Sequence, residues 1–515
     1  MPTIDGTLRA TARGRPTAHA LTFGDSTYTY AELDAAVDRV AAKLAVLGLI
    51  KGDRFALMAT NSDRFVIAFY AASRMGAVFV PINPASAPPE VDYLLRDSGS
   101  TMFAVDPALV PVLRAAETAG LPASLKCVVT LGPVEGYEDA FAAGGPAAPP
   151  EVSIAESDDS MIIYTSGTTG KPKGALFDHH RTIWVAVNCI ATCGMRVGDR
   201  FLHVAPLYHG AELCIMLISG TLIGAKHVVL PGFDPAKVLG AMEAERITMF
   251  FGAPTMYIFL LRQPDLATRD LSAWRTGLFG AAPMPASKVE ELTAALPDVE
   301  FIQLCGQTEG GPGGIFLSGE EVRARPDASG RGPLPLTESR VVDEEDNDVR
   351  ADEVGELILR GETVMKGYWN NPIETAEALR GGWLRTGDLA RIDADGYVTI
   401  VDRLKDMIIT GGRNVYSVEV ESALAGHPDI ADCAVIARPH TEYGESIVAV
   451  VVPRGGRTVT LEDVRGFCRE RIASYKLPHD LIVIDTIPRN LSGKILKHKL
   501  RATLVTKADA APGDK

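Results

Sequence analysis

The chain has 515 residues, of which 46% are hydrophobic and 23% charged, and its formal net charge is −14. A chain well above about 300 residues is too long for one hydrophobic core, so we expect two or more domains. The acidic balance argues against a nucleic-acid-binding protein, which needs a basic face. Residues 1–30 lack the apolar core of a signal peptide, and Arg74 and Lys226 interrupt the longest apolar stretches, so we expect no transmembrane helix. The seven cysteines lack metal-binding spacing, as is typical of reduced thiols in a cytoplasmic protein.

Helices and strands alternate through the first part of the chain. We expect short strands and turns in the first 30 residues. Apolar residues at helical spacing predict a helix over residues 32–47, and a second helix is predicted from a cap at Asn61–Ser62 to Arg74. Strands are predicted over residues 54–58 and 77–84. This alternation is typical of an α/β fold, in which helices cover a sheet.

The stretch YTSGTTGKPKG, residues 164–174, follows an apolar strand and combines hydroxyls, glycines and two lysines. Glycines let backbone N–H groups approach an anion closely, hydroxyls add donors, and the lysines add positive charge. The composition predicts a loop that binds a polyphosphate. It is not the P-loop pattern, because Thr165 and Pro172 stand where that pattern has Gly and Ser or Thr. The alternative is an ordinary flexible surface turn.

Further along the chain, strands end in turns that carry candidate site residues. His209 follows an apolar strand, where a lone histidine is more often structural than functional. TGLFGAAPMP, residues 276–285, is predicted as a strand followed by a turn of small residues, which is equally typical of a plain strand-to-helix turn. IQLCGQTEGG, residues 302–311, is predicted as a strand ending in a glycine turn that presents Thr308 and Glu309.

The last third of the chain is predicted to be rich in strands from about residue 335 to 400. Asp388 lies in a Thr-Gly-Asp turn, where an exposed Asp is ordinarily only a turn residue. Strands and helices then alternate, with helices predicted over residues 417–425 and 461–473. The basic run from Lys494 to Arg501 is by charge alone typical of a solvated helix face. We expect residues 506–515 to be disordered.

Taken in order, the motifs at residues 164–174, 302–311, 386–389 and 402–406 resemble those of AMP-forming adenylate-forming enzymes, in the branch of the acyl-CoA synthetases and fatty-acid–CoA ligases. The resemblance extends from about residue 15 to 503. It implies an α/β fold with a large N-terminal domain of several subdomains, residues 1–402, that binds ATP and the acid. It also implies a small, mobile α+β C-terminal lid domain, residues 403–515, with a hinge near Lys405.

The resemblance implies roles around ATP for residues of these motifs. Glu309 would ligate Mg²⁺, Thr308 would contact the α-phosphate, and Lys494 would contact the acid, the α-phosphate and the ribose. Asp388 and Arg403 would bind the ribose hydroxyls. Cys305 stands where most relatives have an aromatic residue that stacks on adenine. The other implied ATP or AMP contacts are Thr165, which would also be catalytic, Ser166, Gly167, Thr168, Thr169, Gly170, Lys173, Gly280, Ala281, Ala282, Pro283, Gly306 and Gln307.

The resemblance also implies sites for the acid and for CoA. Gly210 stands where amino-acid-activating members have an Asp, which disfavours an amino-acid substrate. Apolar residues around 209–217 and 250–260 favour a fatty, alicyclic or aromatic monocarboxylic acid, and we favour a medium-to-long-chain fatty acid. Ile409 replaces a Lys of luciferase-type members, which argues against an oxygenase. The implied acid pocket is His209, Gly210, Thr255, Gly280, Gln307 and Gly311, and the implied CoA contacts are Gly411, Gly412 and Tyr443.

The implied reaction activates a small-molecule carboxylic acid with ATP and Mg²⁺ to acyl-AMP and pyrophosphate, then transfers the acyl group to coenzyme A with release of AMP. The alternatives are an acyl-AMP ligase that loads a carrier protein, a salicylate-type or peptide-synthetase loading domain, and a non-catalytic nucleotide- or lipid-binding protein on the same fold. A homodimer and peripheral membrane contact are left open. The spacing from Pro488 to Lys494 also resembles a bacterial acetylation site, so we predict that acetylation of Lys494 stops adenylation.

Overall fold

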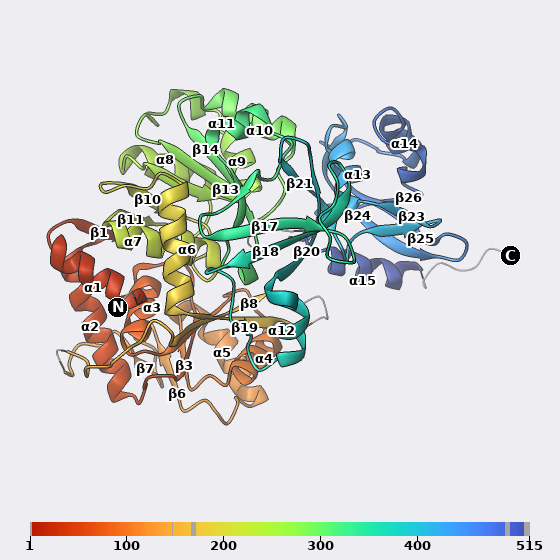
Figure 1. Cartoon of the computed structure of the whole chain (residues 1–515). Coiled ribbons are helices and arrows are strands. Elements are labelled where there is room, and N and C mark those ends of the chain that lie inside the picture. Colours follow the sequence, from red (N-terminus) through yellow and green to blue (C-terminus); the bar gives the residue numbers. More distant parts are fainter. Residues whose placement is uncertain (1–2, 147, 166–170, 490–494, 509–515) are drawn as a thin grey trace.

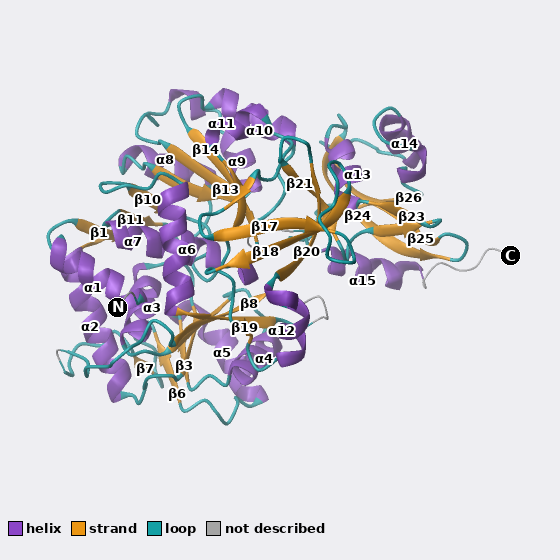
Figure 2. Cartoon of the chain, viewed as in Figure 1, coloured by secondary structure: helices purple, strands orange, loops and turns teal. Residues whose placement is uncertain are grey.

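The computed structural model describes residues 3–146, 148–165, 171–489 and 495–508 (Figure 1). Its strands form sheets of nine, eight, five and four strands, and helices cover the larger sheets (Figure 2). The five-stranded sheet belongs to a separate lobe at the C-terminal end of the chain (Figure 1). The predicted α/β class is therefore confirmed.

The eight-stranded sheet carries the predicted phosphate loop. Its central strands are parallel, whereas β8 and β9 form an antiparallel pair that flanks the loop. Phe55 and Leu57 of β3 face one side of this sheet and Ala56 and Met58 the other, so both faces are buried. In spatial order the strands are β19 (Gly367–Tyr368), β9 (Lys173–Asp178), β8 (Asp159–Thr165), β4 (Val78–Ile82), β3 (Arg54–Met58), β5 (Met102–Val105), β6 (Cys127–Thr130) and β7 (Glu138–Asp139). The associated helices are α3 (Asp63–Arg74), α4 (Pro88–Ser98) and α5 (Val110–Ala119).

The nine-stranded sheet carries most of the other predicted motifs. Six of its strands lie side by side and each pairs in parallel with its neighbour, so their carboxyl ends lie at one edge of the sheet. These strands are β1, β11, β10, β12, β13 and β14. In spatial order the strands are β16 (Gly332–Pro333), β15 (Gly314–Leu317), β14 (Glu300–Gly306), β13 (Thr276–Gly280), β12 (Met249–Gly252), β10 (Arg200–His203), β11 (Lys226–Val229), β1 (His19–Phe23) and β2 (Ser26–Thr29). Helices α8 (Pro235–Ala244), α9 (Pro254–Leu261), α10 (Ala286–Ala295) and α11 (Gly319–Ala324) accompany it.

The largest hydrophobic core joins these two sheets. Phe79 of the eight-stranded sheet and Phe201 of the nine-stranded sheet belong to the same buried cluster, together with residues of the helices between them. Those helices are α1 (Ile4–Gly14), α2 (Tyr30–Val46), α3, α6 (His179–Thr192), the π-helix η2 (Ala211–Ile218) and α7 (Ser219–Ile223). Burial of apolar surface on this scale is the main stabilising contribution to the large lobe.

The four-stranded antiparallel sheet leads to the C-terminal lobe. It consists of β17 (Thr337–Val342), β18 (Val354–Gly361), β20 (Leu384–Ile392) and β21 (Val398–Arg403), and α12 (Pro372–Ala378) precedes β20. The C-terminal lobe has two clusters of buried residues of its own. Its elements are β22 (Ile408–Thr410), β23 (Arg413–Val415), α13 (Ser417–Ala425), β24 (Ile430–His440), β25 (Gly444–Pro453), α14 (Leu461–Arg469), β26 (Asp480–Val483) and α15 (Lys497–Ala508).

Three sequence-based expectations need correction. The first 30 residues contain helix α1 as well as strands, because Thr3 caps the helix and the buried face that follows includes Ile4 and Leu8. Helix α14 ends at Arg469 and not at residue 473. Residues 506–508, expected to be disordered, continue helix α15, and residues 509–515 lie outside the described residues.

Candidate active site

Two neighbouring parallel strands, β13 and β14, end in glycines at the same edge of the nine-stranded sheet. A Cβ atom on Gly280 would lie 2.2 Å from the carbonyl oxygen of Leu304, and one on Gly306 would lie 2.1 Å from that of Gly313. No larger residue fits at either position without a backbone shift. Ala281, directly after β13, has a φ of 66°, which a non-glycine residue rarely adopts. The turn from Gly280 to Pro283 thus consists of small residues, of which Gly280 packs closely against β14 while Ala281 and Pro283 are exposed.

Glu309 follows β14 and lies against the strand that enters the phosphate loop. Its carboxylate Oε1 accepts a hydrogen bond from the hydroxyl of Thr165 at 3.1 Å and another from the hydroxyl of Tyr368 at 3.0 Å. The backbone carbonyl of Glu309 accepts from the N–H of Met365 at 2.9 Å. The structure thus brings together two predicted site residues from separate motifs, with Tyr368 as a third partner.

The residues around Glu309 fit a magnesium ion held with a nucleotide. None of the described residues donates a hydrogen bond to its second carboxylate oxygen, Oε2. The described chain has no group of three or more His, Cys, Asp and Glu side chains placed to hold a metal. Mg²⁺ commonly binds through one or two carboxylates plus phosphate oxygens and water, so one available carboxylate oxygen suits it.

Lys173, at the start of β9, faces the same place from the other side of the phosphate loop. Its ammonium forms an ion pair with Glu374 of α12 and lies 5.1 Å from the centroid of the Tyr368 ring. Sequence reasoning missed both Glu374 and Tyr368. They lie about 200 residues from Lys173 in the chain, and only the pairing of β19 with β9 brings them to it.

Asp388 and Arg403 occupy directly opposite positions on β20 and β21. Nε of Arg403 lies 2.8 Å from Oδ1 of Asp388. Burial and the Asp388 carboxylate raise the pKa of the Cys305 thiol to about 12, and the Arg403 charge opposes the rise. The structure therefore brings these three predicted nucleotide contacts together, with a carboxylate and a guanidinium side by side.

A small gap, too narrow to hold a water molecule, lies between α6, η2 and the turn after η4 (Thr308–Gly310). Two of the predicted acid-pocket residues adjoin it: Gly311 lines it, and a Cβ on Gly210 would lie 3.2 Å from Cδ1 of Ile163 and 3.3 Å from Cγ of Pro312. The gap is largely apolar. Its lining residues are Ile163, Phe177, Thr182, Val185, Cys214, Gly311 and Pro312.

The other predicted acid-pocket residues are not among those that line this gap. His209 precedes η2, and burial lowers its pKa to about 4, so its imidazole is neutral near pH 7. Its Nε2 is buried without a hydrogen-bond partner among the described residues. Thr255 is in the first turn of α9, Gln307 precedes η4, and Gly280 ends β13. Sequence reasoning did not find the π-helix, a rare conformation that is frequent at functional sites.

The three residues predicted to contact CoA meet in the C-terminal lobe. Gly411 and Gly412, with φ of 57° and 74°, form the tight turn between β22 and β23. The N–H of Gly411 donates to the carbonyl oxygen of Tyr443 at 2.9 Å, and the Tyr443 side chain is half exposed. Lys405 lies in the connection between β21 and β22, where burial and the neighbouring Arg403 charge lower its pKa.

Some predicted residues lie outside the described residues: Ser166, Gly167, Thr168, Thr169, Gly170 and Lys494.

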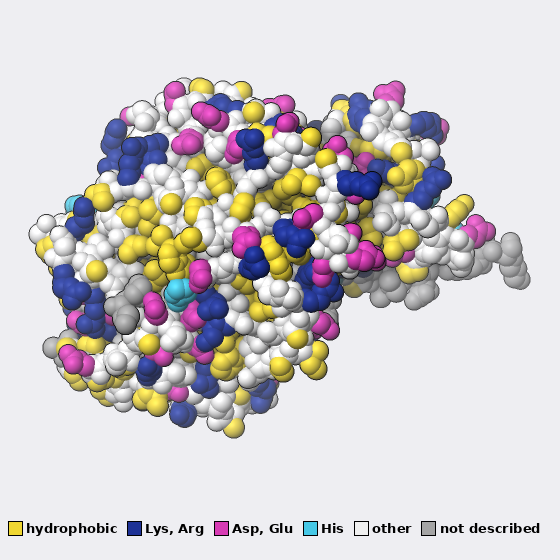
Figure 3. All heavy atoms as spheres, in the orientation of Figure 1, with side chains coloured by type: hydrophobic (Ala, Val, Ile, Leu, Met, Phe, Trp, Pro, Cys, Tyr) yellow, Lys and Arg dark blue, Asp and Glu magenta, His cyan; other side chains and the backbone are white. Residues whose placement is uncertain are grey.

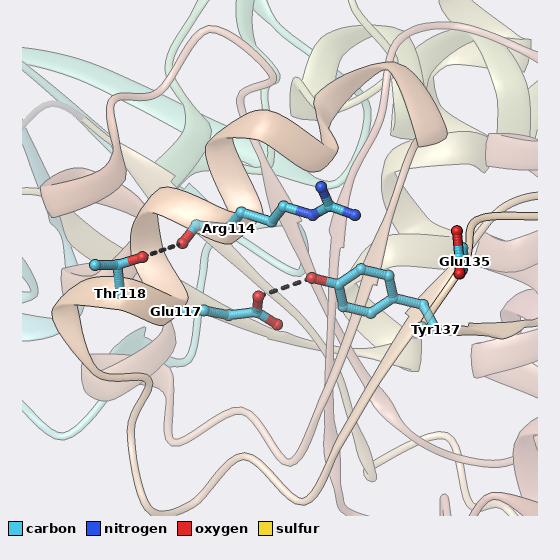
Figure 4. Close-up of a pocket in the computed structure, with 6 residues that line it drawn as sticks. Arg114, Glu117, Thr118, Glu135 and Tyr137 are labelled. Carbon is cyan, nitrogen blue, oxygen red and sulfur yellow. Dashed lines mark hydrogen bonds between the residues drawn. The ribbon is translucent and has the colours of Figure 1, made fainter.

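A second, open hollow is lined by α5 and the segment before β7 (Figure 4). There the hydroxyl of Tyr137 donates to Glu117 at 2.7 Å, and no predicted site residue is involved. On the face shown in Figure 3, acidic and basic side chains are interspersed over both lobes. Within the described ranges, no helix has the length and hydropathy needed to cross a membrane.

Comparison with known proteins adds an independent set of findings. The sequence model of the AMP-binding enzyme family matches residues 8–369, and that of the AMP-binding enzyme C-terminal domain matches residues 419–494. A feruloyl-CoA synthase of an Amycolatopsis species is 38% identical over 492 residues, which cover 95% of this chain and 96% of the relative. The long-chain-fatty-acid–CoA ligase FadD13 of Mycobacterium tuberculosis is 36% identical over 494 residues, which cover 96% of each chain.

Solved structures with a similar fold carry nucleotide ligands. The anthranilate CoA ligase AuaEII in complex with anthranoyl-AMP matches with a TM-score of 0.90 and 29% identity over 98% of each chain. ATP-bound MatB from Rhodopseudomonas palustris matches with a TM-score of 0.89 and 32% identity, also over 98% of each chain.

Proposed function

Because the chain belongs to the family of AMP-binding enzymes, we propose that it is an AMP-forming acid–CoA ligase that activates an apolar carboxylic acid. The observation that carries the proposal is the hydrogen bond from Thr165 to Glu309, which joins the strand entering the phosphate loop to the Glu309 carboxylate of the second motif. ATP and CoA are the co-substrates. Similarity to CoA ligases over nearly the whole length of both chains supports this function.

The first half-reaction joins the acid to AMP. The acid carboxylate is already ionised, so it attacks the α-phosphorus of ATP without a protein nucleophile, and pyrophosphate leaves. The protein contributes positioning and neutralisation of charge. Glu309 would hold Mg²⁺ through Oε2, and a bound Mg²⁺ would supply positive charge against the phosphate oxygens. Lys173 would contact the phosphates, and Lys494 would stabilise charge on the α-phosphate.

The nucleoside end would lie between the strand ends and the four-stranded sheet. The Asp388 carboxylate accepts, and the Arg403 guanidinium donates, which together suit the two hydroxyls of a ribose. The small, exposed side chains of Ala281 and Pro283, in the turn after β13, would leave room for the flat adenine ring. Cys305, beside Asp388 and Arg403, offers no ring for stacking, so we propose that adenine packs on backbone here.

The second half-reaction transfers the acyl group to CoA. The thiolate of CoA attacks the acyl carbonyl, the bond to AMP breaks, and AMP leaves. We propose that residues 403–515 rotate at Lys405 between the two half-reactions, which withdraws Lys494 and brings in the turn at Gly411 and Gly412. The position of this turn beside the half-exposed Tyr443 supports a role at the surface that CoA would approach.

We propose a monocarboxylic acid with an apolar body as the substrate, aromatic or fatty. The residues that pack around Gly210 and Gly311 are mainly apolar, and apolar surroundings suit a substrate with an apolar body. The names of the two relatives described above add support, since they specify ferulic acid and long-chain fatty acids. A cytoplasmic location stays a prediction.

Product analysis with a panel of acids tests the function. The purified protein is incubated with ATP, Mg²⁺, CoA and ferulate, indoleacetate, octanoate or dodecanoate, and AMP, pyrophosphate and acyl-CoA are quantified. Equal amounts of AMP and acyl-CoA with at least one acid are expected. Acyl-AMP without any thioester would instead indicate an acyl-AMP ligase that serves a carrier protein. No pyrophosphate with any acid would favour a non-catalytic binding protein.

A further inference from the structure

Tyr368 lies between two groups of opposite charge beside the phosphate loop. Its hydroxyl donates to Oε1 of Glu309 at 3.0 Å, and its ring lies 5.1 Å from the ammonium of Lys173. A tyrosine hydroxyl is protonated near pH 7, so it acts as the donor in this hydrogen bond and the carboxylate as the acceptor.

The hydroxyl restricts the carboxylate of Glu309. Thr165 and Tyr368 both donate to Oε1, from β8 on one side and β19 on the other. Two donors on one oxygen limit rotation of the carboxylate about its last torsion, which is otherwise broad. The second oxygen, Oε2, then keeps a constant direction. Hydrogen bonds of this kind to a ligating carboxylate tune and orient it.

The aromatic ring restricts Lys173. A cation over the face of a tyrosine ring is attracted by the ring's quadrupole. Lys173 also pairs with Glu374, which lies on α12 a short distance along the chain from Tyr368. The ion pair and the ring contact together hold the lysine at the flank of the phosphate loop. A triphosphate that binds there would exchange Glu374 for its own oxygens while the ring contact remains.

Tyr368 is itself held firmly. Its N–H donates to Oγ1 of Thr375 at 2.8 Å, and it pairs with Ala175 of β9. The N–H of the next residue, Trp369, donates to the carbonyl oxygen of Gly174 at 2.7 Å. Hydrogen bonds at Tyr368 and at the next residue therefore fix the backbone from which the Tyr368 side chain extends.

We infer that Tyr368 is a positioning residue, whose hydroxyl orients Glu309 toward the metal of the metal–nucleotide complex and whose ring holds Lys173 beside the phosphates. The inference rests on the proposed function. It predicts separable contributions: Tyr368→Phe removes only the hydrogen bond to Glu309, whereas Tyr368→Leu also removes the ring contact with Lys173.

The test is a titration of the protein with Mn²⁺ in the presence of a non-hydrolysable ATP analogue, followed by electron paramagnetic resonance of free Mn²⁺. Tyr368→Phe is expected to weaken Mn²⁺ binding on the order of 10-fold, since hydrogen bonds to charged groups contribute at about that level. Affinity for the analogue without metal should stay within about 2-fold, because the ring still faces Lys173. Tyr368→Leu should weaken both.

Tyr93→Phe is the matched control. The Tyr93 ring lies 5.7 Å from Lys171 on the same loop, and its hydroxyl donates to the carbonyl oxygen of Pro172 at 2.9 Å, but it does not contact Glu309. This variant should bind Mn²⁺ like the wild type. The double variant Tyr368→Phe, Glu309→Gln tests whether Tyr368 acts through Glu309. If it does, removing the Tyr368 hydroxyl has no further effect on Mn²⁺ affinity once Glu309 is already Gln. Comparing the two variants in this background also removes the effect of folding differences.

Unchanged Mn²⁺ affinity in Tyr368→Phe, or an equal loss in Tyr93→Phe, would overturn the inference. So would a full additional loss in the Glu309→Gln background. These results test the inference only if the wild-type protein forms acyl-CoA. A wild type that forms none would contradict the proposed function itself, which separates the two failures.

Discussion

Arg403 faces Asp388 across two adjacent antiparallel strands, with Nε 2.8 Å from Oδ1. The pair lies at the end of β21, immediately before the connection to the C-terminal lobe. A ribose that binds there would exchange part of this contact for its own hydroxyls. The geometry thus links the nucleoside end of the proposed ATP site with the segment proposed as the hinge.

Asp388→Asn should raise the KM for ATP on the order of 10-fold while the KM for the acid changes little. The amide keeps the size of the side chain but loses the charge that strengthens hydrogen bonds to the ribose hydroxyls and to Arg403. Steady-state kinetics with ATP and acid varied separately measure this split. Asp393→Asn is the matched control, because Asp393 pairs with Arg325 at 2.6 Å at the opposite end of the same strand pair. An equal rise in both variants would remove Asp388 from the nucleotide site.

Gly306→Ala should destabilise the large lobe by more than about 2 kcal/mol, because its Cβ would lie 2.1 Å from the carbonyl oxygen of Gly313 and the backbone must move. Denaturant unfolding measures the change, and ATP affinity should fall with it. Gly332→Ala, in the same sheet, is the control, since its Cβ would meet no heavy atom within 4 Å. Similar free energies of unfolding for the two variants would show that the backbone at the end of β14 shifts at little cost.

Stability should fall as the pH drops below about 6.5, the ordinary pKa of histidine. Burial lowers the pKa of His179 to about 4, and its Nδ1 accepts a hydrogen bond from the N–H of Ile4 at 3.2 Å. The unfolded chain therefore takes up a proton that the folded chain resists, so the contribution of His179 is complete above pH 6.5 and is lost toward pH 4. The slope is about 1.4 kcal/mol per pH unit for one such group.

Denaturant unfolding between pH 4 and 8 measures that slope. His179→Gln should flatten it by about one proton, whereas His498→Gln, at an exposed position of α15, should leave it unchanged. A slope that is the same in all three proteins would show that His179 does not titrate with folding.

Local sequence patterns predicted the regular elements well where one physical signal dominates. The apolar spacing over residues 32–47 and the Ser62 cap correspond to α2 and α3. Helix α1 was missed because its buried face includes threonines: the Thr7 hydroxyl donates to Ile4 and the Thr11 hydroxyl to Thr221, which satisfies them inside the core. A pattern of apolar residues alone does not detect such a helix.

In the candidate site, too, residues within local motifs were predicted, whereas residues placed by long-range strand pairing were not. The resemblance identified Thr165, Glu309, Asp388 and Arg403, and the structure brings each to a partner from the same set. Tyr368 and Glu374 carry no local signal, because their positions depend on the pairing of β19 with β9. The π-helix at Ala211–Ile218 was not foreseen either, since its sequence is a plain apolar run.

The central claim is tested most directly by separating the two half-reactions in Lys494→Ala. Acid-dependent exchange of pyrophosphate into ATP is measured first, and thioester formation from supplied acyl-AMP and CoA second. The wild type should perform both. The variant should lose exchange by on the order of 10²–10³-fold, since it lacks a charge that stabilises the α-phosphate, yet should still convert acyl-AMP to acyl-CoA. Full exchange in the variant, or no thioester from acyl-AMP in the wild type, would contradict an AMP-forming acid–CoA ligase.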